Sequence, residues 1–173
     1  MSTYATFLRG INVGNIRIKM ADLKETFEAM GMRSVQTILQ SGNVVFEHDD
    51  PPEAIKTRLE AGLSERFRYE AFVQVYPADI LPDVIAAYPF PRDEAYHAYV
   101  IFVETPAAFE ELRTFAASIG DEAAQIQFGK QVIYWQVVKG NSTETPLAKI
   151  LAKAKYKSTT TVRNIQTLEK MLG

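Results

Sequence analysis

Apolar residues in the first half of the chain follow two periods in turn, one typical of strands and one typical of helices. Short runs rich in β-branched and aromatic residues predict strands at residues 3–8, 35–39, 44–48 and 72–76. Between them, apolar residues at helical spacing predict two helices, with inner faces formed by Met20, Leu23, Phe27 and Met30, and by Ile55, Leu59, Leu63 and Phe67. The predicted order is βαββαβ, the signature of a ferredoxin-like unit. We expect Leu23, Phe27, Leu59 and Leu63 to be buried beneath the first sheet.

The second half nearly repeats this order after a linking helix near residues 80–88. Strands are predicted at 98–103, 125–128 and 132–138. One helix is predicted to begin at Thr105-Pro106 and to end at Gly120, and a second is predicted to begin at Thr145-Pro146. A β-branched segment at residues 159–161 is the candidate for a short edge strand, and a last helix is predicted from about Arg163, with Ile165, Leu168 and Leu172 facing inward. A helix start is also predicted in the first half at Asp50, as N-cap, followed by two prolines.

The predicted fold class is therefore α+β, with two tandem ferredoxin-like (βαββαβ-type) units packed into one compact protein. The first unit is expected at residues 1–76, the linking helix and turn at 77–96, and the second unit with a C-terminal helix at 97–173. Such a unit leaves one sheet face bare, so we expect the two halves to pack together or to abut edge to edge.

Composition narrows the classes of function. The 173 residues include no cysteine, which excludes disulfides and thiolate metal sites, and the N-terminus has no secretory signal pattern. No apolar run reaches the ~18 residues that a membrane span requires. We therefore expect a cytoplasmic protein without a membrane partner. A net charge of −2 argues against a dedicated nucleic-acid binder.

The charge is unevenly distributed along the chain. Residues 146–173 carry six lysines and arginines against one glutamate, a net charge of +5, and the rest of the chain carries −7. This basic end either attracts anions locally or is the solvated outer face of a helix.

Two polar turns are the candidate functional features. The loop from Arg9 to Gly14 follows a strand. Its glycine-flanked turn could present backbone N–H groups, and Arg9 its guanidinium, to a carboxylate or phosphate. The loop lacks the Gly-Lys-Ser/Thr of a Walker A loop. The turn from Gln40 to Asn43 joins two strands, and Ser and Asn commonly bond their own backbone in such turns. Either loop could equally serve the fold alone.

Other chemistries find little support in the sequence. Ser41 as a nucleophile would need a base, and the chain has only two histidines, His48 and His97. Two histidines without cysteine give a poor set of zinc ligands, so we expect no metal site. The predicted strand from Gly42 to Phe46 lacks the paired aromatic residues that stack RNA bases, and aromatic residues of the second half are as readily explained by packing.

Three segments carry a family resemblance that spans essentially the whole chain. The sequences LRGINVG at residues 8–14, QSGNVVF at 40–46, and TVRN at 161–164 with Thr167 resemble a widespread bacterial family known as domain of unknown function 1697. The resemblance implies a two-unit ferredoxin-like α+β fold and no known activity.

The functional hypothesis follows from the chemistry of these motifs. Their side chains supply mainly hydrogen-bond donors, with two guanidinium groups and no acid or histidine, which favours holding an anion over moving a proton. We expect one shallow site for a small anionic or nucleotide-like ligand, formed by Arg9, Asn12, Ser41, Asn43, Arg163 and Asn164. No cofactor is implied. An enzyme of unrecognised type using the same cluster, and an interaction module with no small-molecule site, remain as alternatives.

Overall fold

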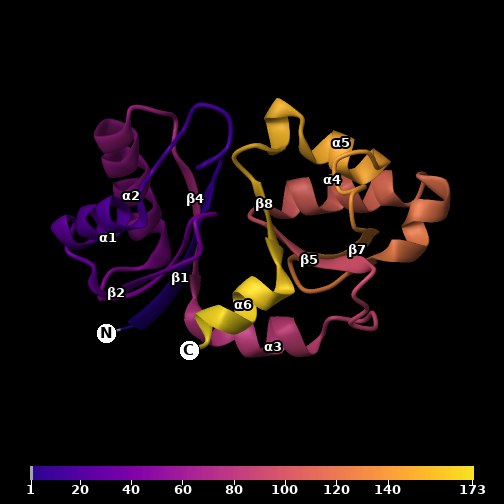
Figure 1. Ribbon diagram of the computed structural model, residues 1–173, viewed down its shortest axis with the longest axis horizontal. Coiled ribbons are helices and arrows are strands. Elements are labelled where there is room, and N and C mark those ends of the chain that lie inside the picture. Colours follow the sequence, from indigo (N-terminus) through magenta and orange to yellow (C-terminus); the bar gives the residue numbers. More distant parts are fainter. Residues whose placement is uncertain (1) are drawn as a thin grey trace. The chain divides into compact units, whose positions relative to one another are not determined.

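The computed structural model describes residues 2–173, which form two compact units: residues 2–82 with 170–173, and residues 83–169 (Figure 1). Each unit contains one four-stranded sheet in which every neighbouring pair of strands is antiparallel. The fold is therefore mixed α+β, as the alternating hydrophobic periods predict.

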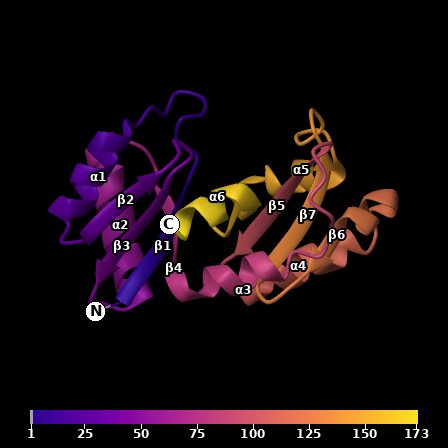
Figure 2. The same ribbon diagram turned by 60° about the horizontal axis from the view of Figure 1, so that its bottom comes forward.

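In the first unit, two helices cover one face of the sheet (Figure 2). The strands lie in the order β2-β3-β1-β4. Their bounds are β1 Ser2–Arg9, β2 Arg33–Ile38, β3 Asn43–His48 and β4 Phe72–Pro77, and the helices are α1 Met20–Ala29 and α2 Pro52–Phe67. The predicted core is confirmed, because Leu23 and Phe27 of α1 and Leu59 and Leu63 of α2 are fully buried. They pack with sheet residues that include Leu8.

The second unit has the same arrangement of strands, in the order β6-β7-β5-β8. The bounds are β5 Tyr96–Val103, β6 Ile126–Phe128, β7 Val132–Val138 and β8 Thr160–Asn164. One sheet face packs against α4 (Pro106–Ala116) and α5 (Pro146–Leu151) in a core that contains Ile101, Leu112, Ile133, Trp135 and Leu147. The remaining helices are α3 Leu81–Ala86, α6 Ile165–Met171, and the short 3₁₀ segments η1 Ala78–Ile80, η2 Gly120–Gln125 and η3 Ala154–Tyr156.

Capping decides where several helices begin and end. Thr105 and Thr145 are the predicted N-caps, and each side chain accepts a hydrogen bond from the backbone N–H three residues on. The prediction that Asp50 is an N-cap is wrong. Pro51 holds that position, and the Asp50 carboxylate instead accepts a hydrogen bond from Arg58 at 3.1 Å. The predicted helix end at Gly120 is also wrong. α4 ends at Ala116, and Gly120, with φ +73°, opens the 3₁₀ segment η2.

The C-terminal region differs from the predicted helix in its start and its inner face. Arg163 and Asn164 belong to the edge strand β8, which pairs with β5, and α6 begins only at Ile165. Ile165 is fully buried as predicted, whereas Leu172 lies after the last helical residue and is 50% exposed. Among residues 2–173, no helix combines the length and apolar character that crossing a membrane demands.

A buried hydroxyl without a partner predicts a stabilising substitution. Thr6 of β1 is fully buried, and its Oγ1 has no hydrogen-bond partner within residues 2–173. Thr6→Val keeps the shape and removes the unsatisfied group, so we expect the free energy of unfolding in urea to rise by about 1 kcal/mol. Thr160 is the matched control, because its buried Oγ1 donates to Tyr156 O at 2.9 Å. Thr160→Val should lower stability by about 1 kcal/mol. Equal effects of the two changes would contradict this explanation.

Tyr69 predicts a loss of stability at alkaline pH. Burial raises the pKa of Tyr69 from 10.0 to about 12. Because the folded protein disfavours the phenolate, this contribution to stability is complete below pH 10 and is lost as the pH rises towards 12. We expect Tyr69→Phe to make the decline in unfolding free energy between about pH 10 and about pH 12 shallower than in the parent protein. Denaturation curves that decline equally in both proteins would refute the assignment.

Candidate functional site

The loop after β1 is held in place by Asn12. Its Oδ1 accepts from the Ile18 backbone N–H at 2.9 Å, and its Nδ2 donates to Ile18 O at 3.2 Å and Gln40 O at 2.7 Å. Asn12 itself has φ +55°, a left-handed conformation that Asn tolerates better than most residues. The amide of Asn12 therefore joins the first loop to the turn between β2 and β3.

Asn43 has a similar role inside that turn. It is fully buried, and its Nδ2 donates to Ile38 O and to Ser41 Oγ, both at 2.9 Å. Both amide N–H groups of Asn43 are thus donated within the protein. In the first unit, the two asparagines of the predicted anion site therefore use their side-chain amides to hold the loop after β1 and the β2–β3 turn in place.

Gly42 lies in the same β2–β3 turn, and two independent constraints require a glycine at this position. Its φ is +91°, which side chains on L-residues rarely allow. A Cβ added there would lie 2.8 Å from Leu8 Cβ and 2.9 Å from Ile11 Cδ1. The Gly42 carbonyl accepts from Leu8 N at 2.8 Å, so the backbone of the turn lies directly against β1. The two sequence motifs thus fit against each other.

The two arginines of the predicted site lie in different units. Arg9 ends β1, is half-buried, and burial lowers the pKa of its guanidinium. Arg163 of β8 is buried, and its Nη1 donates to Thr161 Oγ1 at 2.7 Å and Val162 O at 2.9 Å. Part of the donor capacity of Arg163 is therefore used within its own strand. A single site that contains both arginines stays a prediction.

A serine–histidine pair is not formed within the first unit. Ser41 precedes β3 and His48 ends it, so about 20 Å of extended chain separates them. His48 is buried, its Nδ1 accepts from the Asp50 backbone N–H at 3.0 Å, and its Nε2 lies 3.3 Å from Arg58 Nη1. His48 thus belongs to a local cluster with Asp50 and Arg58. The structure groups no three potential metal ligands within residues 2–173.

The aromatic residues of the second sheet belong to its core. The rings of Tyr99 and Trp135 lie 5.4 Å apart on the face that α4 and α5 cover. Tyr134 occupies the opposite face and donates from its hydroxyl to Val84 O at 2.7 Å. The two rings that lie side by side on the central strands β5 and β7 are therefore covered by helices, and an RNA-binding protein would need them on an open face.

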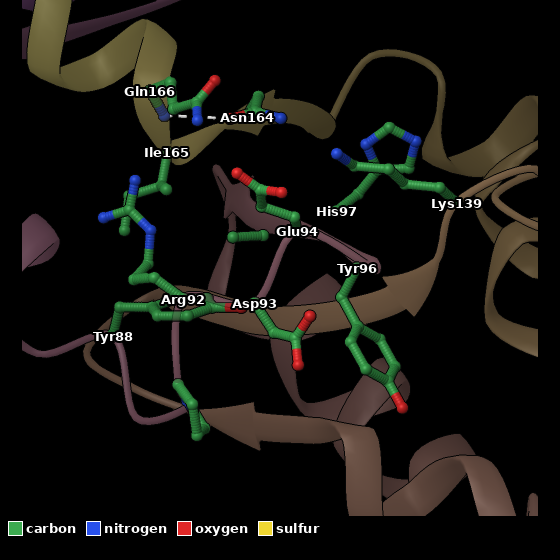
Figure 3. Close-up of a pocket in the computed structure, with 12 residues that line it drawn as sticks. Tyr88, Arg92, Asp93, Glu94, Tyr96, His97, Lys139, Asn164, Ile165 and Gln166 are labelled. Atoms are coloured by element: carbon green, nitrogen blue, oxygen red, sulfur yellow. Dashed lines mark hydrogen bonds between the residues drawn. The ribbon is translucent and has the colours of Figure 1, made fainter.

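The second unit contains a pocket that the sequence does not predict as a site. Its volume is about 290 Å³, and it lies where the start of β5 meets the start of α6 (Figure 3). We call it the β5–α6 pocket. It is lined by Tyr88, Pro91, Arg92, Asp93, Glu94, Tyr96, His97, Ala98, Lys139, Asn164, Ile165 and Gln166. Three separate segments of one unit thus contribute to it.

Several polar groups of the pocket have no hydrogen-bond or ion-pair partner among residues 2–173. The Lys139 ammonium forms no ion pair or hydrogen bond, and the His97 imidazole contacts only the ring of Tyr99, stacked at 5.1 Å. Asn164 accepts at Oδ1 from the Gln166 backbone N–H at 2.9 Å, which leaves its Nδ2 unused. Figure 3 shows the Lys139, His97 and Asn164 side chains on the same side of the pocket.

The acidic and aromatic residues complete the pocket. Arg92 forms an ion pair with Glu169 at 2.9 Å, and Asp93 Oδ1 accepts from the Ala95 backbone N–H at 2.8 Å. Glu94 has no partner within the described chain. The Tyr88 hydroxyl oxygen is buried without a hydrogen bond, and burial raises the pKa of Tyr88 although the nearby Arg92 opposes the shift.

Sequence reasoning finds one residue of this pocket, Asn164. The others lie in the linker before β5 and the first residues of β5, directly after β7, or at the start of α6, and no motif joins these three segments. The only signal was the concentration of polar residues, with Arg92, Asp93, Glu94 and His97 following a turn that contains two prolines. Such a run is also typical of an exposed linker.

Comparisons with known proteins identify a family and a fold. The family model described as Protein of unknown function (DUF1697) matches residues 1–134. A solved structure, the conserved bacterial protein SP0830 from Streptococcus pneumoniae, superposes with a TM-score of 0.79 at 23% identity, over 98% of this chain and 96% of that chain. At this identity the likeness shows the fold alone. No curated protein matches the chain.

Gly42 provides a test of the interlocked motifs. Gly42→Ala adds left-handed strain, about 1 kcal/mol, and overpacking against Leu8 and Ile11, about 1–3 kcal/mol. Gly140→Ala is the matched control, because Gly140 has φ +89° but nothing within 4 Å of an added Cβ. We expect Gly42→Ala to lower the unfolding free energy more than Gly140→Ala does. Equal losses in urea denaturation would show that the close approach to β1 adds nothing.

Proposed function

We propose that this chain, which belongs to the DUF1697 family of proteins of unknown function, binds a small ligand with an anionic group in the β5–α6 pocket. The observation that carries the proposal is the set of unused donors at that pocket. The Lys139 ammonium and the Asn164 amide both line it, and neither Nζ nor Nδ2 has a partner within residues 2–173. Ammonium and amide N–H groups are the donors that bind carboxylate and phosphate oxygens.

The size and walls of the pocket support a small organic ligand. Its volume of about 290 Å³ lies at the lower end of the range for small-molecule sites, which favours a small metabolite over a dinucleotide. Pro91 and Ala98 line the pocket beside the polar groups. A few convergent polar side chains on a partly apolar wall are typical of ligand sites.

The loop cluster expected from the sequence is the competing location. Asn12 and Asn43 weigh against it, because their amide N–H groups are already donated to backbone and side-chain oxygens of the first unit. An anion bound by these amides would have to replace those bonds, at the cost of the loop structure. Of the six expected residues, Asn164 alone lines the β5–α6 pocket.

We also propose that the two units arose by duplication of one ferredoxin-like unit. In each unit the strands lie in the order second, third, first, fourth. In each, the first strand is central and pairs with both the third and the fourth. A common ancestor would account for the shared order although the residues of the two halves do not match well.

Lys139 provides the test of the proposed ligand. Inorganic phosphate and succinate are titrated into the ¹⁵N-labelled protein, and amide shifts are followed up to about 10 mM, enough to detect millimolar affinity. We expect shifts at residues 94–98, 139 and 164–166. Lys139→Met should weaken binding about tenfold or more, because it removes a charge-assisted hydrogen bond.

The matched control is Lys130→Met, a change at an exposed lysine of the same unit that does not line the pocket. It should leave the affinity unchanged. Shifts that gather around Arg9 and Asn12 would favour the loop cluster, and equal weakening by both lysine variants would refute the pocket.

A further inference from the structure

We infer that the ligand of the β5–α6 pocket is a small zwitterion that carries one carboxylate and one ammonium group. This inference rests on the proposed function and goes beyond it, because it assigns a cationic group to the ligand as well as an anionic one. The chemical class is that of amino acids and related amino carboxylates.

Two charged residues of the pocket already have partners within the protein. Arg92 is paired with Glu169 at 2.9 Å, and Asp93 accepts a backbone hydrogen bond from Ala95 at 2.8 Å. These two contacts hold the wall of the pocket together. They leave Lys139 and Glu94 as the charged residues of the pocket without a partner in the described chain.

The charges of Lys139 and Glu94 have opposite signs and do not form an ion pair with each other. No ion pair within 4.0 Å joins Glu94 to Lys139, although both line the same pocket. In Figure 3 the Glu94 carboxylate lies in the space beneath Asn164, and the Lys139 side chain extends towards that space from the right, beside His97. The pocket thus presents an anion and a cation separated by a gap.

Ligands of different charge would interact differently with these two residues. A ligand with only an anionic group gains the attraction of Lys139 but is repelled by Glu94, and a purely cationic ligand has the reverse problem. A zwitterion places an opposite charge against each residue and has no net charge to remove from water. Charge complementarity with both Lys139 and Glu94 therefore favours a ligand that carries both a carboxylate and an ammonium group.

The neutral groups of the pocket fit the same ligand. A carboxylate has two oxygens, and the unused Nδ2 of Asn164 can donate to the one that Lys139 does not bind. The Tyr88 hydroxyl, a neutral donor whose pKa is raised by burial, has no hydrogen-bond partner within the described residues.

The experiment compares matched ligands by calorimetry and by amide shifts. Each set contains a zwitterion, the same molecule without its amine, and the same molecule without its carboxylate. The sets are 4-aminobutyrate with butyrate and propylamine, and L-leucine with 4-methylpentanoate and isopentylamine. We expect at least one zwitterion to bind about tenfold or more tightly than both of its partners, with shifts at residues 94–98 and 139.

Two variants assign the charges. Glu94→Gln should remove the advantage of the zwitterion and leave the affinity for the matched carboxylate equal or higher. Lys139→Met should weaken both. Glu144→Gln is the matched control, because Glu144 is an exposed carboxylate of the same unit that does not line the pocket.

The outcomes separate the two proposals. If the carboxylates bind in the pocket as tightly as the zwitterions, and Glu94→Gln changes neither affinity, the zwitterion inference is wrong and the anion site stands. If amines bind most tightly, or if no ligand of either set shifts the pocket residues, both proposals are overturned.

Discussion

The close approach of Gly42 to β1 is the constraint on which the first unit depends. The turn between β2 and β3 can lie against Leu8 and Ile11 only because position 42 has no Cβ and accepts a left-handed φ. The contact fixes where β3 enters the sheet beside β1, and the Leu8–Gly42 hydrogen bond and the Asn12 amide then hold the loops around it. Helices α1 and α2 pack against the sheet that results.

The close packing around Gly42 gives the sequence motifs of the first unit a structural explanation. Motif residues such as Asn12, Gly42 and Asn43 attract attention because turns of this kind are common at ligand sites. Here their side chains and backbone serve the turn itself, since the amide groups are donated at 2.7–3.2 Å within the unit. A motif that identifies a family therefore need not identify a binding site, because a backbone with several left-handed residues restricts the sequence just as strongly.

The β5–α6 pocket has the opposite character. Its residues come from segments without a motif, and several of its polar groups have no internal partner. Unsatisfied donors and acceptors are costly when they are buried and are tolerated where water or a ligand can reach them. The contrast with Asn12 and Asn43, whose amide donors are all used, is the physical reason to place ligand binding at the pocket.

The hydrophobic pattern by itself determined the elements and the core. Helical spacing placed Leu23, Phe27, Leu59 and Leu63 in the core, and the β-branched run near Thr160 indicated the edge strand β8, because burying one face imposes a period on the sequence. Only the tertiary structure decided that Arg163 and Asn164 lie in that strand, and that Lys139, Glu94 and Asn164 share one pocket. Residues so distant in the chain meet through sheet pairing, which leaves no local period. A pocket formed in this way therefore has no signature in a single sequence.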